Sequence, residues 1–110
     1  MFNKESQFAA LLGEGTDLEG NFSFDGTVRI AGKVKGTIFS NETVIISDTA
    51  NIEADISGEV IIISGNVKGK IKASSRVEIN KPAYFEGEIE SPSLKVEEGV
   101  IFHGQTKMDE

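Results

Sequence analysis

Apolar and polar residues alternate along most of the chain in short stretches that recur at a nearly constant period. One unit has the form apolar–x–small–x–apolar and occurs six times, at spacings of 16, 18, 15, 18 and 17 residues. Its copies begin at Leu18, Val34, Ile52, Val67, Phe85 and Phe102. Side chains at i, i+2 and i+4 share one face of a β-strand, so each copy predicts a short strand.

A second unit, apolar–x–apolar, lies between the copies of the first and repeats every 16 or 17 residues. We expect its inward pairs to be Val28/Ile30, Val44/Ile46, Val60/Ile62, Val77/Ile79 and Leu94/Val96. Because so short a repeat has no room for a helical crossover, each turn of chain must stack on the previous one. The pattern predicts an all-β fold, a single-stranded parallel β-helix (solenoid) of about six turns of 15–18 residues.

The limits of the repeat set the expected domain boundaries. We expect the β-helix to span residues 15–106, with a flexible N-terminal tail at 1–14 and a short C-terminal tail at 107–110. At about 4.8 Å per stacked turn, six turns make a core roughly 29 Å long. The chain is therefore expected to form one domain with short flanking segments.

Outward residues of the repeats alternate in the sign of their charge from one turn to the next. Glu19 is followed by Lys35, then by Glu53, then by Lys68 and then by Glu86. In a parallel stack these side chains lie over one another, and each opposite-charge pair contributes about 0.2–1 kcal/mol, whereas a slipped register is penalised. The alternation predicts a charge ladder that fixes the register.

The small residue at the centre of the first unit is glycine in all copies except the third, which has Ala54. It marks either a position where another part of the coil packs closely or a corner where the backbone bends. A phosphate-binding loop is a poor alternative. The nearest candidate, residues 65–71, has three residues between its glycines instead of four, and it ends in Ile71 where a hydroxyl is needed.

Composition argues against catalysis and nucleic-acid binding. There is no cysteine, and 11 basic against 18 acidic residues give a net charge of −7, which repels a phosphate backbone. The sole histidine, His103, falls on an outward position of the last repeat, so no general acid–base pair or Ser–His–Asp set is expected. We predict no enzyme activity, no catalytic or cofactor-binding residues, no metal site and no nucleotide.

The N-terminal segment is a candidate membrane contact. No run of about 18 apolar residues could span a bilayer, and no secretory signal is recognisable, so a cytoplasmic protein is expected. The segment does carry apolar residues at near-helical spacing beside one cation, namely Phe2, Lys4, Phe8, Leu11 and Leu12. It either lies on a lipid surface or covers the first turn of the coil.

The two ends of a solenoid expose open β edges, which pair with another chain unless they are capped. Apolar residues gather near both predicted ends, and little chain is left beyond them to serve as a cap. We expect a C-terminal subunit interface at Val100, Ile101 and Phe102 and an N-terminal one at Leu18, Phe22 and Phe24. The alternative is that these residues only complete the terminal core.

The span from about residue 15 to residue 104 resembles the bactofilins, bacterial cytoskeletal proteins, in its V-x-G-x-I units, its variable period and a phenylalanine in the final turn. The start Met1-Phe2-Asn3-Lys4 is similar to the membrane-targeting start of many members. The resemblance implies a right-handed β-helix that assembles without nucleotide into non-polar filaments, head to head and tail to tail. It also implies attachment at the inner face of the cell membrane.

Two other classes remain open from the sequence. A hexapeptide-repeat enzyme also coils, but its turns are more regular and its chemistry generally depends on histidines that this chain lacks. A monomeric or dimeric β-helical adaptor would use its flat faces to bind a protein partner. Concentration-dependent assembly separates a filament from an adaptor, and the sequence does not identify client proteins.

Overall fold

The computed structural model describes residues 10–13, 15 and 17–108, and all secondary structure in this part of the chain is β. Every strand pairing is parallel. The strands are β1 (Ala10–Leu12), β2 (Asp17–Phe24), β3 (Val28–Ile30), β4 (Lys33–Ser40), β5 (Thr43–Ile46), β6 (Asn51–Ile63), β7 (Asn66–Ile79), β8 (Tyr84–Ser91), β9 (Leu94–Val96) and β10 (Ile101–Met108).

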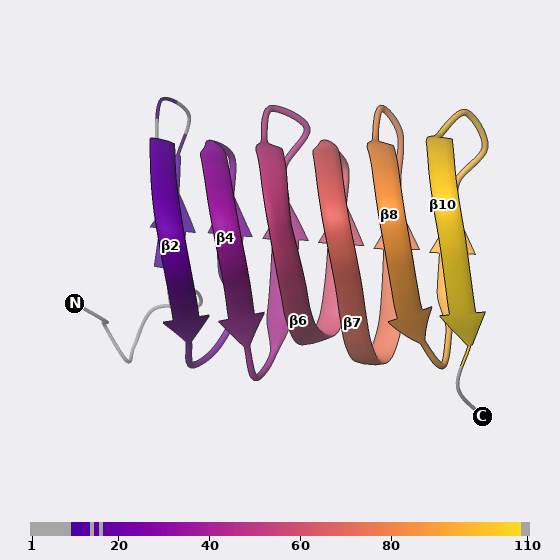
Figure 1. Cartoon of the computed structure of the whole chain (residues 1–110), viewed down its shortest axis with the longest axis horizontal. Helices are drawn as coiled ribbons and strands as arrows, with labels where there is room; N and C mark the ends of the chain where they lie inside the picture. Colours follow the sequence, from indigo (N-terminus) through magenta and orange to yellow (C-terminus); the bar gives the residue numbers. More distant parts are fainter. Residues whose placement is uncertain (1–9, 14, 16, 109–110) are drawn as a thin grey trace.

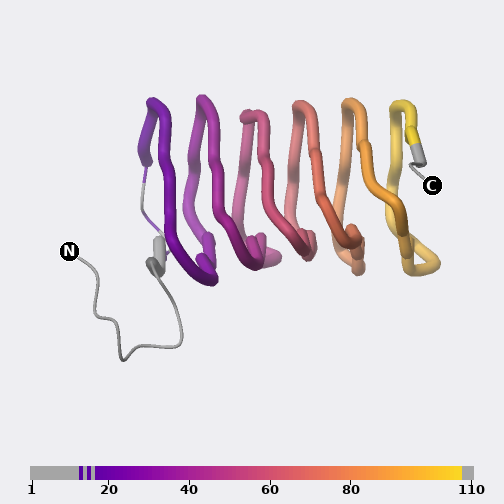
Figure 2. The backbone as a smooth tube through the Cα atoms, turned by 90° about the horizontal axis from the view of Figure 1, so that it is seen from below, coloured from indigo at the N-terminus to yellow at the C-terminus, as the bar shows by residue number. Residues whose placement is uncertain are grey.

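The chain winds into a β-solenoid, which confirms the predicted fold class. The nearer strand segments in Figure 1 run downward and the fainter ones run upward while the chain advances from left to right, so the coil is right-handed. Six long strand segments stack through β2, β4, β6, β7, β8 and β10, so about five turns are completed between the first and the last. The rod measures 35 × 30 × 23 Å, and its first and last turns lie at opposite ends (Figure 2).

Inward columns of valine and isoleucine form the core. Val34, Ile52, Val67 and Phe85 follow one another in register, and each is fully buried. β-Branched side chains suit this position because they pack well on a pleated, close-packed surface. Since each turn contacts mainly its two neighbours, the stability of the rod is the sum of such repeated interfaces.

One turn departs from the expected phase. The sequence pattern places Val60 and Ile62 inward, but Ile61 and Ile63 pair with Val44 and Ile46 and are fully buried, while Ile62 faces outward in line with Ile45. The cause is a bulge: the N–H groups of Glu59 and Val60 both donate to the carbonyl of Glu42, at 2.8 and 3.3 Å. β6 passes this point with one residue fewer than its neighbours, since residues 57–60 lie opposite 39–43 of the preceding turn and residues 58–60 lie opposite 73–76 of the next. This difference of one residue exchanges the two faces of the strand.

The central glycines form a column, and both reasons expected for glycine, close packing and an unusual backbone conformation, apply to it. Gly36, Gly69, Gly87 and Gly104 have φ values of 123°, 139°, 141° and 153°, a region that residues with a Cβ rarely adopt. A Cβ at any of them would overlap the carbonyl oxygen of the residue stacked below it in the preceding turn. Glycine thus permits the backbone conformation and the close approach together.

The strand register stacks the charged residues in the order that the predicted charge ladder requires. Glu19 pairs with Lys35, Lys35 with Glu53, Glu53 with Lys68 and Lys68 with Glu86. In the neighbouring columns β7 and β8 place Lys70 over Glu88 and Lys72 over Glu90, and the Lys70–Glu88 ion pair measures 3.8 Å. The side chains are exposed, so each pair stabilises the fold weakly, and the alternation acts mainly against misregister.

The described coil extends beyond both expected boundaries. β1 pairs with β3, with Ala10 opposite Val28 and Leu12 opposite Ile30, so the first strand lies before residue 15. At the other end β10 continues to Met108, two residues past the expected limit of 106. The repeat pattern underestimates the length of the coil, because a strand at either end can pair with one neighbouring strand without belonging to a complete sequence repeat.

Candidate functional site: the two open ends of the coil

The N-terminal end of the coil is formed by β1 and β2, and in the described part of the chain each pairs with one strand only, β3 and β4 respectively. The inward side chains of β2 are Leu18, Phe22 and Phe24, and all three are only partly buried. Their partners one turn further in are buried completely or almost completely. The end therefore exposes a cross-section of the core instead of a finished surface.

The C-terminal end is formed by β9 and β10, whose strand partners among the described residues are β7 and β8 alone. Phe102 lies on the inward side of β10 and stacks on the fully buried Phe85, with ring centroids 5.2 Å apart and an interplanar angle of 29°. One face of the Phe102 ring thus completes the core. The ring remains partly exposed because the described chain provides no further turn to cover it.

Three residues predicted at this end have different orientations. Val100 and Phe102 are partly buried against the core and belong to the open cross-section. Ile101 alternates with Phe102 and points outward from the side of the rod, where 52% of its surface is exposed. It borders the end without being part of the cross-section.

Sequence reasoning did not assign Leu94 and Val96 to the end, although it identified them as the last members of the second repeat. Val96 continues the inward column of Ile63 and Ile79, yet 44% of its surface is exposed. Leu94 is partly buried against the core. The open cross-section at this end is therefore defined by Leu94, Val96, Val100 and Phe102.

Edge strands at both ends present backbone donors and acceptors as well as apolar side chains. Within the described residues, β2 and β10 are each hydrogen-bonded to a strand on one side only. Unpaired strand edges favour association with another strand, and natural proteins usually protect them with charges, prolines or bulges. Between residues 101 and 107 the outward side chains include His103 and Lys107, whereas Phe102 and Thr106, which pair with the inward Phe85 and Ile89, carry no charge.

The predicted membrane segment is only partly described. Phe2, Lys4 and Phe8 lie outside the described residues. Leu11 and Leu12 belong to β1, where they pair with Arg29 and Ile30, so this part of the segment is a strand of the coil and is not helical. No helix in the described part of the chain has the length and apolarity to cross a membrane.

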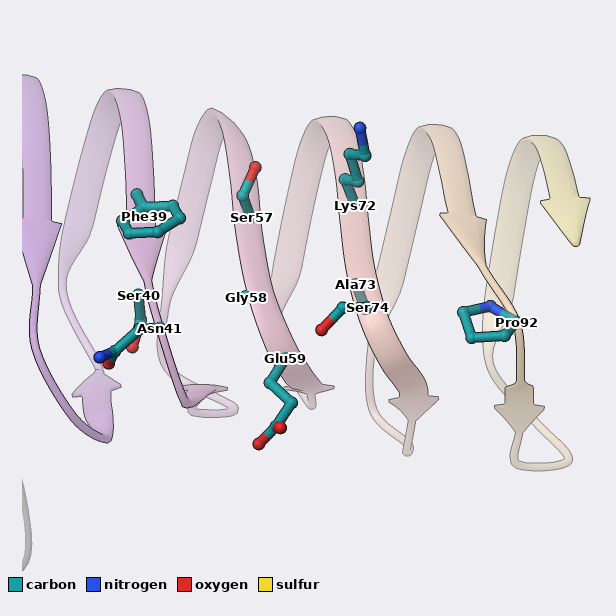
Figure 3. A pocket seen from close by; sticks show the side chains of 10 residues that line it. All are labelled: Phe39, Ser40, Asn41, Ser57, Gly58, Glu59, Lys72, Ala73, Ser74 and Pro92. Atoms are coloured by element: carbon teal, nitrogen blue, oxygen red, sulfur yellow. The ribbon is translucent and has the colours of Figure 1, made fainter. Parts of the chain in front are cut away.

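An open groove on the side of the rod is a further surface feature that could bind a ligand. It has a volume of about 770 Å³ and runs across several turns between Phe39, Lys72, Glu59 and Pro92 (Figure 3). Half of the Phe39 surface is exposed there. No cluster of three metal-ligating side chains occurs among the described residues, and His103 is exposed beside the ring of Tyr84, 5.8 Å between centroids.

Comparisons with known proteins agree with the geometry of the rod. The family model "Bactofilin: Polymer-forming cytoskeletal" matches residues 10–107. The chain is also similar to Bactofilin BacO of Myxococcus xanthus (strain DK1622), with 32% identity over 99 residues that cover 90% of this chain and 79% of that protein. No solved structure gives a significant match.

Proposed function

Because this chain belongs to the bactofilin family of polymer-forming cytoskeletal proteins, we propose that it is a filament-forming scaffold whose subunits join through the open ends of the coil. The observation that carries this proposal is the incomplete burial at those ends. Phe102 and Val96 are inward residues that the last turn leaves partly uncovered. Burial of this apolar surface against a second copy supplies the driving force for assembly.

The same structure favours contacts between like ends, which give a non-polar filament. In the inner turns the space next to each column glycine holds the carbonyl oxygen of the preceding turn. At Gly20 the Phe22 ring approaches this space instead, with its Cζ 3.9 Å from the position of a Cβ. The space beside Gly20 is thus bordered by a ring of the same strand, and we propose that this end meets an identical end about a two-fold axis.

Assembly is expected to need no nucleotide. The nearest loop-like segment begins at Gly65, where a Cβ would lie 2.8 Å from the carbonyl oxygen of Ala50, so this glycine serves a tight corner of the coil. Purified protein should form filaments in negative-stain electron micrographs and pellet in equal amounts with and without ATP or GTP. Monomers at all accessible concentrations would contradict filament formation and favour the adaptor, for which the Phe39 groove provides a surface. A requirement for nucleotide would contradict the proposed mechanism.

We also propose that the segment before β1 attaches the filament to the inner face of the cell membrane. A short apolar segment with one lysine binds lipid weakly as a single copy, but a filament presents many copies. Deleting residues 1–9 should reduce co-sedimentation with anionic liposomes by about tenfold or more, while β1 and polymerisation are retained. The matched control is Phe39→Ser, which removes an exposed phenylalanine elsewhere and should leave lipid binding unchanged. Equal sedimentation of the truncated and full chains would refute the attachment.

The proposed scaffold is non-enzymatic. The charged residues of the side groove, Glu59 and Lys72, have no histidine, cysteine or second carboxylate among the residues that line the groove. General acid–base chemistry needs a titratable group held beside a partner, and nucleophilic chemistry needs an activated nucleophile. Neither arrangement is found in that groove.

A further inference from the structure

One side of the rod carries bands of charge that alternate in sign along the axis. These bands are the outward residues of each long strand before the central small residue, and we refer to them as the banded face. From the first turn to the sixth, the pairs are Asp17/Glu19, Lys33/Lys35, Asn51/Glu53, Asn66/Lys68, Tyr84/Glu86 and Ile101/His103. Odd turns are acidic, and the second and fourth are basic.

The charges of the banded face are nearly balanced and are not joined in close ion pairs within the described chain. The face has four carboxylates and three ammonium groups, a net charge of −1 against −7 for the whole chain. Among the described residues the ion pairs are Lys70–Glu88 and Arg76–Glu78, and neither lies on this face. A chain of net charge −7 repels its own copies in general, but the repulsion between two copies of this nearly balanced face is small.

Symmetry determines how two such faces can meet. A two-fold axis parallel to the rods places each turn opposite the same turn of the other copy, so equal charges face each other. A two-fold axis perpendicular to the rods places the second turn opposite the fifth and the third opposite the fourth. Lys35 then faces Glu86, and Glu53 faces Lys68, twice each because the contact is self-complementary. Only the antiparallel arrangement pairs opposite charges in full overlap.

We propose that the banded face binds a second copy of this chain side by side and antiparallel, so that filaments pair laterally. This inference rests on the proposed end-to-end polymer. In a filament built from like-end contacts, successive subunits point in opposite directions. A neighbouring filament that is displaced by one subunit therefore places an antiparallel copy beside every subunit. An axial shift of one turn would oppose like charges, so the contact also defines its own register.

Individual exposed charge pairs are weak, and lateral pairing depends on their repetition along the filament. Because the Debye length falls from about 30 Å at 0.01 M salt to about 3 Å at 1 M, pairing should be strong at low salt and lost at high salt. End-to-end assembly, which buries apolar surface, should persist at high salt. Salt therefore separates the two contacts in one preparation.

The test uses charge reversal in the full-length chain. Lys35→Glu and Glu86→Lys filaments are formed separately, and lateral pairing is measured from micrographs and from low-speed pelleting at low salt. Each variant alone should lose pairing by about tenfold, because residues 35 and 86, which face each other across the contact, then carry the same sign. Mixing the two kinds of filament should restore pairing, and the double variant should restore it alone.

Arg29→Glu is the matched control, since it makes the same charge change on β3, which lies away from the banded face and has a paired strand on either side. It should leave lateral pairing unchanged. A loss equal to that of Lys35→Glu would mean that net charge matters and not the banded face, and would overturn the proposal. Failure of the mixture to restore pairing would also overturn the proposal. It would indicate a parallel contact shifted by one turn, in which Lys35 faces Glu53 instead of Glu86 and the two variants do not compensate each other.

Failure of this inference is distinguishable from failure of the proposed function. Single filaments at low salt would overturn lateral pairing and leave end-to-end assembly intact. If no filaments form, the soluble chain is examined by analytical ultracentrifugation with the same variants. A dimer that Lys35→Glu and Glu86→Lys each abolish, and that their mixture restores, would support the banded face alone; a monomer would overturn it. Thermal melts confirm that each variant is folded.

Discussion

Replacing Phe102 by arginine is expected to stop filament growth and leave dimers joined through their N-terminal ends. The ring of Phe102 covers the buried Phe85 from one side and is open on the other, so an interface at this end would enclose it completely. A guanidinium there has no described partner and would have to be desolvated. The concentration needed for filaments should rise at least about 30-fold, equivalent to a hot-spot loss of about 2 kcal/mol.

Electron microscopy and sedimentation velocity measure this effect, and far-ultraviolet circular dichroism verifies that the β fold is retained. Phe102→Leu should keep most of the assembly because it preserves an apolar contact on Phe85. Phe39→Arg is the control for a charge placed on an exposed phenylalanine at the side of the rod, and it should form filaments of normal length. Long filaments of Phe102→Arg would show that this end is not a polymer contact.

Replacing Gly87, an inner member of the glycine column, by alanine is expected to destabilise the fold strongly. The new Cβ would overlap the carbonyl oxygen of Gly69 and lie 2.8 Å from its carbonyl carbon, and the φ of 141° is itself unfavourable for alanine. Neither group can move without separating β7 from β8. We expect a loss of more than about 4 kcal/mol and a melting temperature lower by more than about 15 °C.

Gly20→Ala separates the two causes. Its φ of 145° is equally unfavourable, but the nearest atom to a Cβ there is Phe22 Cζ at 3.9 Å. Only the backbone strain should remain, about 1–3 kcal/mol. Gly13→Ala, which has open space and no positive φ, should change stability little. Denaturant unfolding measures all three variants, and equal losses for Gly87→Ala and Gly20→Ala would contradict the packing explanation.

Much of the fold could be predicted from the sequence because each turn repeats the same physical requirement. Inward valines and isoleucines recur at the period of one turn, and the glycine column recurs with them. The alternating charges defined the register from Glu19 to Glu86 before any contact was known, and the strand pairings agree with it. A repeat that buries only its neighbours encodes its structure locally.

The candidate site was predicted less completely. Phe102, Phe22 and Phe24 were found at the ends of the rod, since they are the last inward residues of a series. Leu94 and Val96 were overlooked, although they end the other series and 44% of Val96 is exposed. Exposure at an end is a property of the stack, because the same residue type is fully buried when one more turn follows.

The sequence alone determined that this chain forms a β-helical rod of known period and register, because alternation, turn residues and charge are local properties. The tertiary structure decided which of the four consecutive apolar residues Val60–Ile63 point inward. Periodicity cannot select a phase in an unbroken apolar run, and here the Glu42 carbonyl accepts two N–H groups and shifts the strand by one residue. It also decided that Leu11 and Leu12 form the first strand, because a short segment becomes a strand only when a neighbour such as β3 supplies its hydrogen bonds.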